Sequence, residues 1–333
     1  MIRVVEGASA SAFRGTASGV ARVILTVTLN TALDLTYRVP ALTPHASHRV
    51  TEVRERPGGK GLNVARVLAA LGHDVTVTGF AGGDTGRVLR ERLAADGPRV
   101  TDALAEVAGA TRRTLAVADA TTGDTTQFNE PGPAITPAEW TAFLDTYDGL
   151  VRTPGTHAVA LCGSLPPGVP VGAYALLVRA ARAARVPVLL DTSGEPLRRG
   201  VAARPDIVKP NADELAELTG SHEPGQATRD ARRRGAHTVV ASLGADGLLA
   251  VTPEGTWQAR PPAVVRGNPT GAGDSAVAGL LSGLAEGLPW PERLARAVAL
   301  SAATVAAPVA GEYDARTYED LLPRVTVTDR AAA

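Results

Sequence analysis

The sequence predicts an α/β fold in which helices cover both faces of a mostly parallel central sheet, with a small separate β-layer over one edge. From about residue 156 onward, short apolar strands alternate with helices, and this order is typical of a parallel sheet. Two polar, alternating segments earlier in the chain do not suit a sheet that is buried on both faces. They are therefore expected to pair with each other as a lid.

The first half of the chain contains buried strands, two helices and the two half-exposed β segments. Residues 22–29 form a continuous apolar, β-branched run, as expected for a strand buried on both faces. Residues 58–61 (GGKG) then break a polar, alternating stretch and open a helix with regularly spaced apolar positions. The expected elements are strands 22–29, 49–54 and 74–80, helices 62–71 and 85–95, and a hairpin of 114–118 with 124–129.

The second half supplies the regular strand–helix alternation. Its strands are short and apolar, and each is followed by a segment with helical periodicity. The expected strands are 157–161, 186–190, 206–208 and 237–241, followed by a hairpin of 248–251 with 257–260. The expected helices are 171–184, a short one near 196, 212–218, 226–234, and two more that begin at 273 and 290.

Residues 22–325 are expected to form one domain, with the lid built from about 35–57 and 111–130. Residues 1–21 are rich in Ala, Ser and Gly and show no periodicity, so a disordered N-terminal extension is expected there. Residues 326–333 are likewise expected to form a disordered tail.

The composition excludes several classes of protein. The formal net charge is zero and no basic run is present, which argues against a nucleic-acid partner. The single cysteine, Cys162, excludes an internal disulfide framework and a cysteine-based metal site, and fits a reducing cytoplasm. No apolar stretch approaches the roughly 20 residues of a membrane span. A cytoplasmic protein without a membrane partner is therefore expected.

The segment 268–275 (NPTGAGDS) is the most informative motif in the chain. A glycine turn that opens a helix leaves backbone N–H groups unpaired and pointing one way, which makes an anion site. Asp274 lies in that first turn, where a carboxylate is either a helix cap or a base beside a bound phosphate. Taken alone, the motif is consistent with both interpretations.

A second helix start, 58–63 (GGKGLN), places Lys60 and Asn63 beside another glycine turn. This arrangement suits a phosphorylated, polyhydroxylated ligand. The spacing matches neither the Walker A loop nor the G-x-G-x-x-G dinucleotide motif. Only two of the 34 basic residues are lysines, Lys60 and Lys209, which indicates places where a compact positive charge is needed.

Residues 209–214 (KPNADE) form a strand-to-helix turn with two interpretations. Asn211 and Glu214 have the spacing of a capping box, a purely structural device. The same oxygens are also suitable ligands for Mg²⁺ or its waters beside nucleotide phosphates. A further glycine-rich turn, 242–247 (SLGADG), could pass close to a nucleotide or form an ordinary hairpin turn.

Polar side chains follow several of the predicted strands. Because the carboxyl ends of parallel strands meet at one edge of a sheet, these residues are expected to converge on one crevice. Asp34 could accept hydrogen bonds from sugar hydroxyls there, or could be an ordinary turn residue. The set comprises Asn30, Asp34, Ser164, Asp191, Lys209, Asn211, Ser242 and Asp274.

Taken together, these segments resemble the ribokinase-like (PfkB) family of carbohydrate kinases. Residues 58–66 (GGKGLNVAR) are similar to its N-terminal signature, residues 268–274 are similar to its C-terminal one, and the resemblance runs from about residue 23 to 322. Five further motifs resemble the branch that phosphorylates hexose phosphates, with 1-phosphofructokinases and tagatose-6-phosphate kinases. They are 28–34 (TLNTALD), 109–113 (GATRR), 128–133 (FNEPGP), 163–168 (GSLPPG) and 191–194 (DTSG).

The resemblance implies a three-layer α/β/α sandwich with a β-sheet lid, and a role for each motif. Asp274 would act as general base, and the backbone N–H groups of Gly271, Ala272 and Gly273 would stabilise the transferred phosphoryl group. The sugar would be held by Asp34, Gly58, Gly59 and Asn63, and its phosphate by Lys60, Arg112 and Ser164, with Arg49 as a further candidate. ATP would lie against Lys209, Asn211, Ser242, Gly244 and Gly247, and Mg²⁺ against Glu214 and Asn211, directly or through water.

The implied reaction is ATP-dependent phosphorylation of a hexose phosphate. Fructose 1-phosphate is the favoured substrate, and tagatose 6-phosphate and fructose 6-phosphate are the alternatives. A non-catalytic sugar-phosphate-binding protein is the competing class, and the family also implies a homodimer formed through the lid. Two residues depart from the branch's pattern, because Thr31 stands where Pro is usual and Pro269 where a residue with an N–H is usual.

Overall fold

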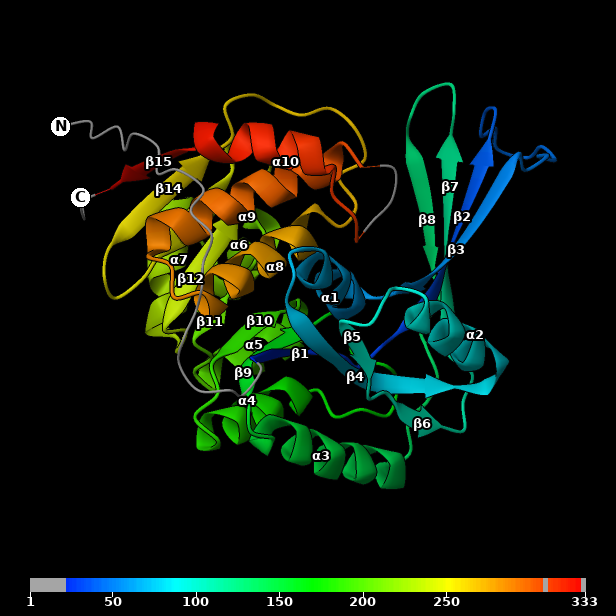
Figure 1. Ribbon diagram of the computed structural model, residues 1–333, viewed down its shortest axis with the longest axis horizontal. Helices are drawn as coiled ribbons and strands as arrows, with labels where there is room; N and C mark the ends of the chain where they lie inside the picture. Colours follow the sequence, from blue (N-terminus) through cyan, green and yellow to red (C-terminus); the bar gives the residue numbers. More distant parts are fainter. Residues whose placement is uncertain (1–21, 308–310, 331–333) are drawn as a thin grey trace.

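The chain folds into a main body with a β-sheet lid at one side (Figure 1). The computed structural model describes residues 22–307 and 311–330. The expected N-terminal extension, residues 1–21, and the last three residues lie outside this part. No helix in the described ranges is both long enough and apolar enough to cross a membrane.

The central sheet has eleven strands and is mostly parallel, as predicted. Its order is β15-β14-β13-β12-β11-β10-β9-β1-β4-β5, with β6 also paired to β4. Every pair from β12 to β5 is parallel, whereas β13, β14 and β15 extend the sheet in antiparallel fashion. The strands are β1 (Val23–Thr28), β4 (Asp74–Gly82), β5 (Val100–Asp102), β6 (Ala105–Val107), β9 (Thr156–Cys162), β10 (Val188–Asp191), β11 (Ile207–Val208), β12 (Thr238–Ser242), β13 (Leu248–Val251), β14 (Thr256–Arg260) and β15 (Thr326–Asp329).

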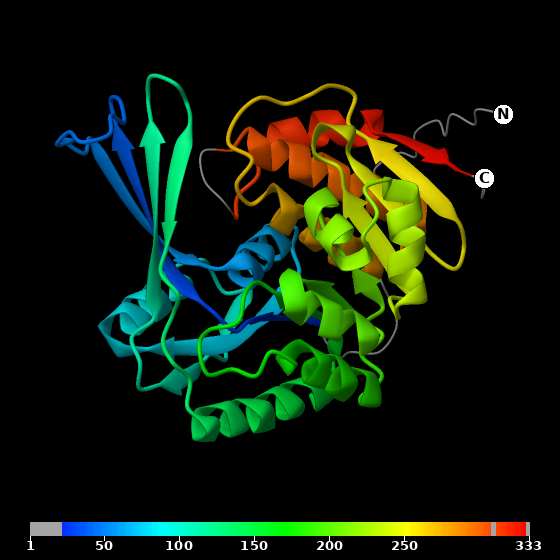
Figure 2. The ribbon, with the colours of Figure 1, turned by 180° about the vertical axis from the view of Figure 1, so that it is seen from behind.

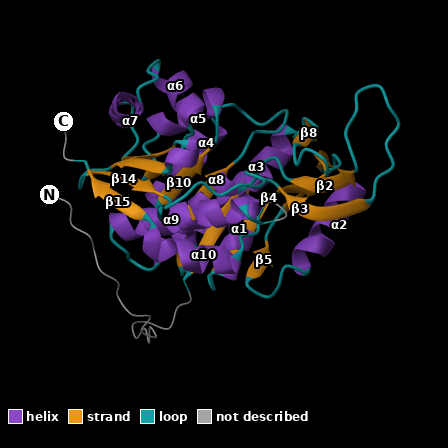
Figure 3. Cartoon of the chain, turned by 90° about the horizontal axis from the view of Figure 1, so that it is seen from above, coloured by secondary structure: helices purple, strands orange, loops and turns teal. Residues whose placement is uncertain are grey.

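Helices cover both faces of this sheet, which confirms the predicted sandwich (Figure 3). Alternate strand residues point into different cores: Leu25 of β1 belongs to the core that also contains residues of α3 to α7, and its neighbour Ile24 belongs to the core that contains residues of α1, α2, α8 and α9. The first layer comprises α3 (Pro137–Arg152), α4 (Ala173–Ala183), α5 (Gly194–Ala202), α6 (Ala212–Thr219) and α7 (Pro224–Arg233). The second comprises α1 (Lys60–Ala70), α2 (Gly83–Ala94), α8 (Ala272–Ala285), α9 (Trp290–Val305) and α10 (Ala315–Leu321), which packs on α9.

The lid is a separate four-stranded sheet beside the main body (Figure 2). It consists of β2 (Ala32–Val39), β3 (Glu52–Gly58), β7 (Arg112–Asp119) and β8 (Thr125–Asn129), in the order β3-β2-β7-β8. The register places Asp34, Thr114 and Asn129 on one face, and Leu35, Leu115 and Phe128 on the other. One face of the lid is therefore polar and the opposite face apolar.

Several parts of the fold differ from the sequence prediction, and strands β2, β5 and β6 are among those that were not expected. Helix α3 was not expected, although its start carries a capping box in which Thr136 and Glu139 satisfy each other's backbone N–H groups and Pro137 occupies the first turn. The expected disordered tail is wrong for residues 326–329, which form β15 against β14. Val327 of this strand is partly buried against the core, and β15 also contacts α9, so this packing orders the segment.

Candidate active site

A cavity of about 1160 Å³ lies between the strand ends of the main sheet and the polar face of the lid. It is large enough for a nucleotide and a second small molecule. Lid residues, the start of α1, the strand ends at Asp191 and Lys209, and the glycine turn before α8 all contribute to its wall. Of the residues predicted to form the site, the wall contains Asp34, Gly59, Lys60, Asn63, Arg112, Lys209, Asn211, Glu214, Ser242, Gly244, Gly247, Gly271, Ala272, Gly273 and Asp274.

Asp274 lies in the first turn of α8 with only 6% of its surface exposed. Gly271 precedes the helix in the left-handed conformation (φ 84°), which a residue with a side chain would adopt only with strain. The Asn63 Nδ2 group donates a hydrogen bond of 2.9 Å to the Asp274 carboxylate. Burial raises the pKa of Asp274 to about 6, although Lys60 and this hydrogen bond oppose the rise. Asp274 is thus ionised at neutral pH and basic enough to accept a proton.

Some backbone N–H groups of the glycine turn before Asp274 already donate hydrogen bonds within the turn itself. The Ala272 N–H donates to the Pro269 carbonyl (3.1 Å), and the Thr270 N–H donates to the Asn268 side chain (3.0 Å). The expectation that Ala272 offers a free N–H is therefore not met in this structure. Within residues 22–307 and 311–330, the N–H groups of Gly271, Gly273 and Asp274 have no hydrogen-bond partner. These three remain available to an anion.

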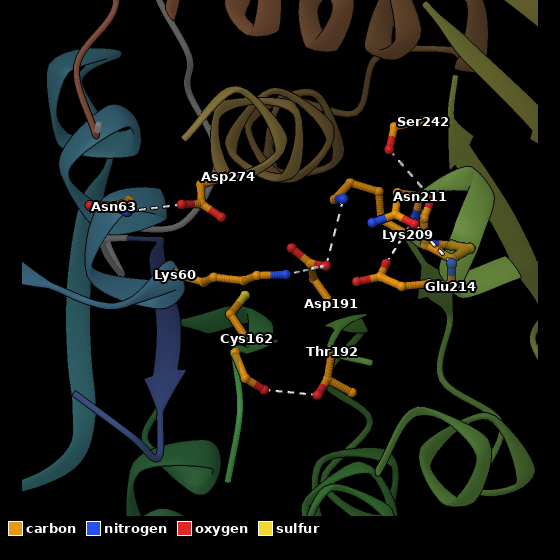
Figure 4. A network of polar contacts seen from close by, with 12 residues as sticks. Lys60, Asn63, Cys162, Asp191, Thr192, Lys209, Asn211, Glu214, Ser242 and Asp274 are labelled. Atoms are coloured by element: carbon orange, nitrogen blue, oxygen red, sulfur yellow. Dashed lines mark hydrogen bonds and ion pairs between the residues drawn. The ribbon is translucent and has the colours of Figure 1, made fainter. Parts of the chain in front are cut away.

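Asp191 stands at the centre of the charged groups, although the sequence analysis gave it no role beyond its place at a strand end (Figure 4). One of its carboxylate oxygens lies 3.3 Å from the Lys60 Nζ and 3.6 Å from the Lys209 Nζ. Asp191 is 1% exposed, and its second oxygen has no partner among the described residues. Asp191 raises the pKa of Lys60 further above its ordinary value, which keeps the ammonium charged. One buried carboxylate thus holds both lysines of the chain.

Asp34 lies in the lid strand β2, not in a turn after the first strand. It accepts a hydrogen bond from the Thr114 hydroxyl, and burial raises its pKa. Gly58 touches it from β3: a Cβ atom at Gly58 would lie 2.0 Å from the Asp34 Cγ. Gly58 is buried and is not part of the cavity wall. Gly58 was expected to contact the sugar directly. In the structure its role is to leave space for the Asp34 carboxylate.

Arg112 faces the same cavity from the lid and is held by two backbone carbonyls. Its Nε donates to the Asn30 carbonyl (3.3 Å) and its Nη1 donates to the Glu130 carbonyl (2.9 Å). Ser164 is exposed and outside the cavity wall, where its hydroxyl accepts a 3.1 Å hydrogen bond from the Asn30 side chain. Arg49 is also exposed and outside the wall. The structure therefore brings Arg112, but neither Ser164 nor Arg49, to the cavity.

Thr31 is one of the two residues that depart from the branch's pattern. Its side chain is buried and bonds to a residue 49 positions later in the sequence. Its hydroxyl donates to the Phe80 carbonyl at the end of the neighbouring strand β4. This hydrogen bond ties the turn between β1 and β2 to the main sheet. The side chain thus restrains a turn at the position where the branch that the motifs resemble usually has Pro.

On the opposite side of the cavity, Asn211 and Glu214 form the capping box that their spacing suggested. The Asn211 Oδ1 accepts from the Glu214 N–H (2.8 Å), and the Glu214 carboxylate accepts from the Asn211 N–H (2.9 Å). Ser242, Gly244 and Gly247 line the wall beside them. The structural interpretation of this motif is therefore confirmed, and one Glu214 oxygen remains outside the box.

Comparison with known proteins gives the family. Residues 26–315 match the pfkB family of carbohydrate kinases. The chain belongs to this family. The prediction of an ATP-dependent carbohydrate kinase with a ribokinase-like fold is thus confirmed.

Individual relatives agree with this assignment. The kinase is 42% identical to the 1-phosphofructokinase of Rhodobacter capsulatus over 286 residues, which cover 84% of this chain and 90% of that protein. It is similar to phosphofructokinase-2 of Escherichia coli in complex with potassium, with a TM-score of 0.83, 31% identity, and coverage of 92% and 99% of the two chains. It is also similar to the "possible 1-phosphofructokinase" of Thermotoga maritima, with a TM-score of 0.81, 26% identity, and coverage of 93% and 100%.

Part of the kinase's cavity was missed by the sequence analysis. Part of the cavity wall is apolar, and Val264, 68% exposed, is its most accessible member. This wall suits the flat apolar faces of a nucleotide base. Its members lie in a loop and on α9, so no local pattern joined them: Pro261, Val264, Val265, Val298, Ala302 and Val305.

Proposed function

We propose that this kinase transfers the γ-phosphoryl group of ATP to D-fructose 1-phosphate and forms fructose 1,6-bisphosphate. The observation that carries the proposal is the buried carboxylate of Asp274 beside free N–H groups at the start of α8, in one cavity with Asp34 and Arg112. The cavity offers cationic or N–H donors on two sides, as a substrate that already carries a phosphate requires. The Rhodobacter capsulatus relative, named 1-phosphofructokinase, favours the 1-phosphate.

In the proposed mechanism, Asp34 accepts hydrogen bonds from sugar hydroxyls and Arg112 binds the phosphate already on the sugar. Asp274 takes the proton from the attacking hydroxyl, a contribution on the order of 10²–10⁴-fold. The N–H groups of Gly271, Gly273 and Asp274 face the charge that develops on the transferred group. Lys209 adds positive charge on the nucleotide side. The lid closes over the sugar and excludes water from the reaction.

The residues present are compatible with Mg²⁺, provided that substrate and water supply most of its ligands. No group of three or more His, Cys, Asp or Glu side chains within the described residues could hold a metal by itself. Glu214 lines the cavity and has one oxygen outside the capping box, whereas the Asn211 Oδ1 is already used as a cap. Mg²⁺ commonly binds through one or two carboxylates together with substrate phosphates. When bound, it would neutralise charge on the phosphates, and Glu214 is the residue we propose to hold it.

A coupled assay of ADP release tests the proposed function. Fructose 1-phosphate, fructose 6-phosphate, tagatose 6-phosphate and unphosphorylated fructose are compared at equal protein concentration. The highest kcat/KM is expected for fructose 1-phosphate, and a higher value for tagatose 6-phosphate would replace it as the substrate. Absence of ADP formation with every sugar would favour the non-catalytic, sugar-phosphate-binding alternative. Asp274→Asn is expected to lose most of kcat with little change in KM.

We also propose that the kinase forms a homodimer through the apolar face of its lid. Val53 and Phe128 lie on this face and are 55% and 59% exposed, unusual values for large apolar side chains in a β-sheet. Sedimentation analysis of Val53→Asp is expected to show monomers at concentrations where the parent protein is a dimer. Leu176→Asp, at an exposed position on α4, is the matched control and should leave the dimer intact. A dimeric Val53→Asp protein would reject this interface.

A further inference from the structure

A chain of side-chain contacts leads from outside the cavity to Asp274. Arg66 and Asn63 are three residues apart on α1 and therefore share one face of the helix. The Arg66 Nη1 donates to the Asn63 Oδ1 (3.3 Å), and the Asn63 Nδ2 donates to the Asp274 carboxylate (2.9 Å). Arg66 is not part of the cavity wall. It thus contacts Asp274 only through Asn63.

The direction of these hydrogen bonds is fixed by the chemistry of arginine. An asparagine amide can turn over and exchange its oxygen and nitrogen, and only its partners decide which way it points. A guanidinium group has donors and no acceptor, so it can face only the oxygen of the Asn63 amide. The Asn63 NH₂ group must then face Asp274, which is the orientation that a carboxylate requires.

Arg66 is itself held rigidly, so it can impose this orientation. Its Nη2 donates to the Pro57 carbonyl (2.8 Å) and its Nε to Asp96 (3.1 Å), and its side chain is 12% exposed. Gly311 covers the contact with its backbone: a Cβ atom there would lie 2.8 Å from the Asn63 Oδ1. All three kinds of nitrogen in the guanidinium group are thus engaged.

We propose that Arg66 is a positioning residue, whose guanidinium group orients the Asn63 amide so that this amide donates to Asp274 and holds the carboxylate for proton abstraction. The inference rests on the proposed function, because it assumes that Asp274 is the base. Without Arg66, the Asn63 amide is free to turn its oxygen toward the carboxylate. That arrangement disfavours the ionised form of Asp274, so a smaller fraction of the enzyme would carry an active base.

Other charged or titratable groups near Asp274 do not depend on Arg66. They are Lys60 on α1, Cys162 on β9, Asp191 on β10 and Lys209 after β11. None of them hydrogen-bonds to Arg66. Replacing Arg66 therefore changes the Asn63 contact and leaves these four groups in place, and it also removes a charge that lowers the pKa of Asp34 in the lid.

The pH dependence of kcat, measured with both substrates saturating, tests the proposal on Arg66→Met. The acid limb of this profile is the range in which kcat falls as the pH decreases. Loss of one hydrogen bond to a charged group should move the acid limb to higher pH by about one unit. The variant is then expected to be roughly fivefold slower than the parent at pH 6, and about equally fast at pH 8.5. A loss of kcat by the same factor at every pH, or an unchanged profile, would overturn the proposal.

Arg90→Met is the matched control. Arg90 makes comparable contacts on α2, to the Asp102 carboxylate (2.6 Å) and the Leu104 carbonyl (2.7 Å), and does not line the cavity. Its variant should keep the parent profile. If Arg66→Met does not fold, Arg66→Gln takes its place: its amide can present either an oxygen or an NH₂ group to Asn63 and so does not fix the Asn63 orientation, and its acid limb should still move upward.

A double-mutant cycle separates this role from other effects of Arg66. Asn63→Ala removes the intermediate residue, so adding Arg66→Met to it should cause no further shift of the acid limb. Additive shifts would show that Arg66 acts by another route. A different result, near-normal turnover of Asp274→Asn, would contradict the proposed function itself. Failure of the Arg66 proposal can therefore be distinguished from failure of the proposed function.

Discussion

Gly58→Ala is expected to disable the sugar side of the cavity without touching the nucleotide side. The added Cβ atom would lie 2.0 to 2.2 Å from three atoms of the Asp34 carboxyl group, whereas ordinary contact begins at 3.4 Å. Backbone on β3 cannot move away easily, because β3 is paired to β2 along its whole length. The Asp34 carboxyl group must therefore move by roughly 1.4 Å.

A displacement of this size is costly for catalysis. A misplacement of about 1 Å reduces the rate on the order of 10²-fold, because hydrogen bonds to the substrate lose their geometry. We therefore expect kcat/KM for the sugar phosphate to fall on the order of 100-fold. The KM for ATP should stay near the parent value, since Asp34 and Gly58 lie on the lid side of the cavity.

Steady-state kinetics with each substrate varied in turn measure both effects. Gly149→Ala is the matched control, because this helical glycine on α3 has open space where a Cβ would be placed. In an Asp34→Ala background, Gly58→Ala should cost little more, since the displaced carboxyl group is already gone. Two results would refute the reasoning. One is an unchanged kcat/KM of Gly58→Ala for the sugar phosphate, and the other is that Gly58→Ala lowers kcat/KM as much in the Asp34→Ala background as in the parent.

Three further predictions concern the base, the sugar phosphate and a helix start. Because the pKa of Asp274 is about 6 and the ionised form is active, kcat should fall about tenfold per unit of pH well below 6, and a pH profile that stays flat down to pH 5 would remove Asp274 from the base role. Arg112→Ala should raise the KM for the sugar phosphate roughly ten- to hundredfold and leave the KM for ATP nearly unchanged; equal effects on both would contradict its assignment. Thr136→Ala should lower the free energy of unfolding by about 1 kcal/mol in urea titrations, through loss of the α3 cap, with kcat unaffected.

Local patterns predicted most of the fold. Continuous apolar runs, as in β1 and β9, indicated strands buried on both faces, and the later strand–helix alternation indicated the parallel sheet. The prediction of a disordered C-terminal tail was wrong for residues 326–329, because their order depends on the packing of Val327 against distant parts of the chain. The short sequence of the tail does not reveal this contact. Helix α3 did carry a local signal, the capping box at Thr136, which the sequence analysis did not use.

The candidate site was predictable where a motif lies at a helix start, and less so where partners are distant in sequence. Asp274 and Lys60 belong to recognisable glycine turns. The role of Asp191 depends on two lysines, one of them 131 residues away, and no spacing reveals such a meeting. The Ala272 hydrogen bond depends on turn geometry, and the contact between Gly58 and Asp34 depends on the register of β2 and β3. The contacts of Asp191 and Gly58 are fixed by tertiary structure, and the Ala272 hydrogen bond by the local turn over residues 269–272.

Strand β15 also has a consequence for the solubility of the folded chain. It pairs with β14 from Trp257 to Arg260, so the backbone groups of that strand on this side are occupied. An uncovered strand at the edge of a large sheet can pair with the same edge of another molecule and start aggregation. The outermost strands, β15 and β5, have only four and three residues and offer little length for such pairing. Four residues near the C-terminus thus act as a cover for an eleven-stranded sheet.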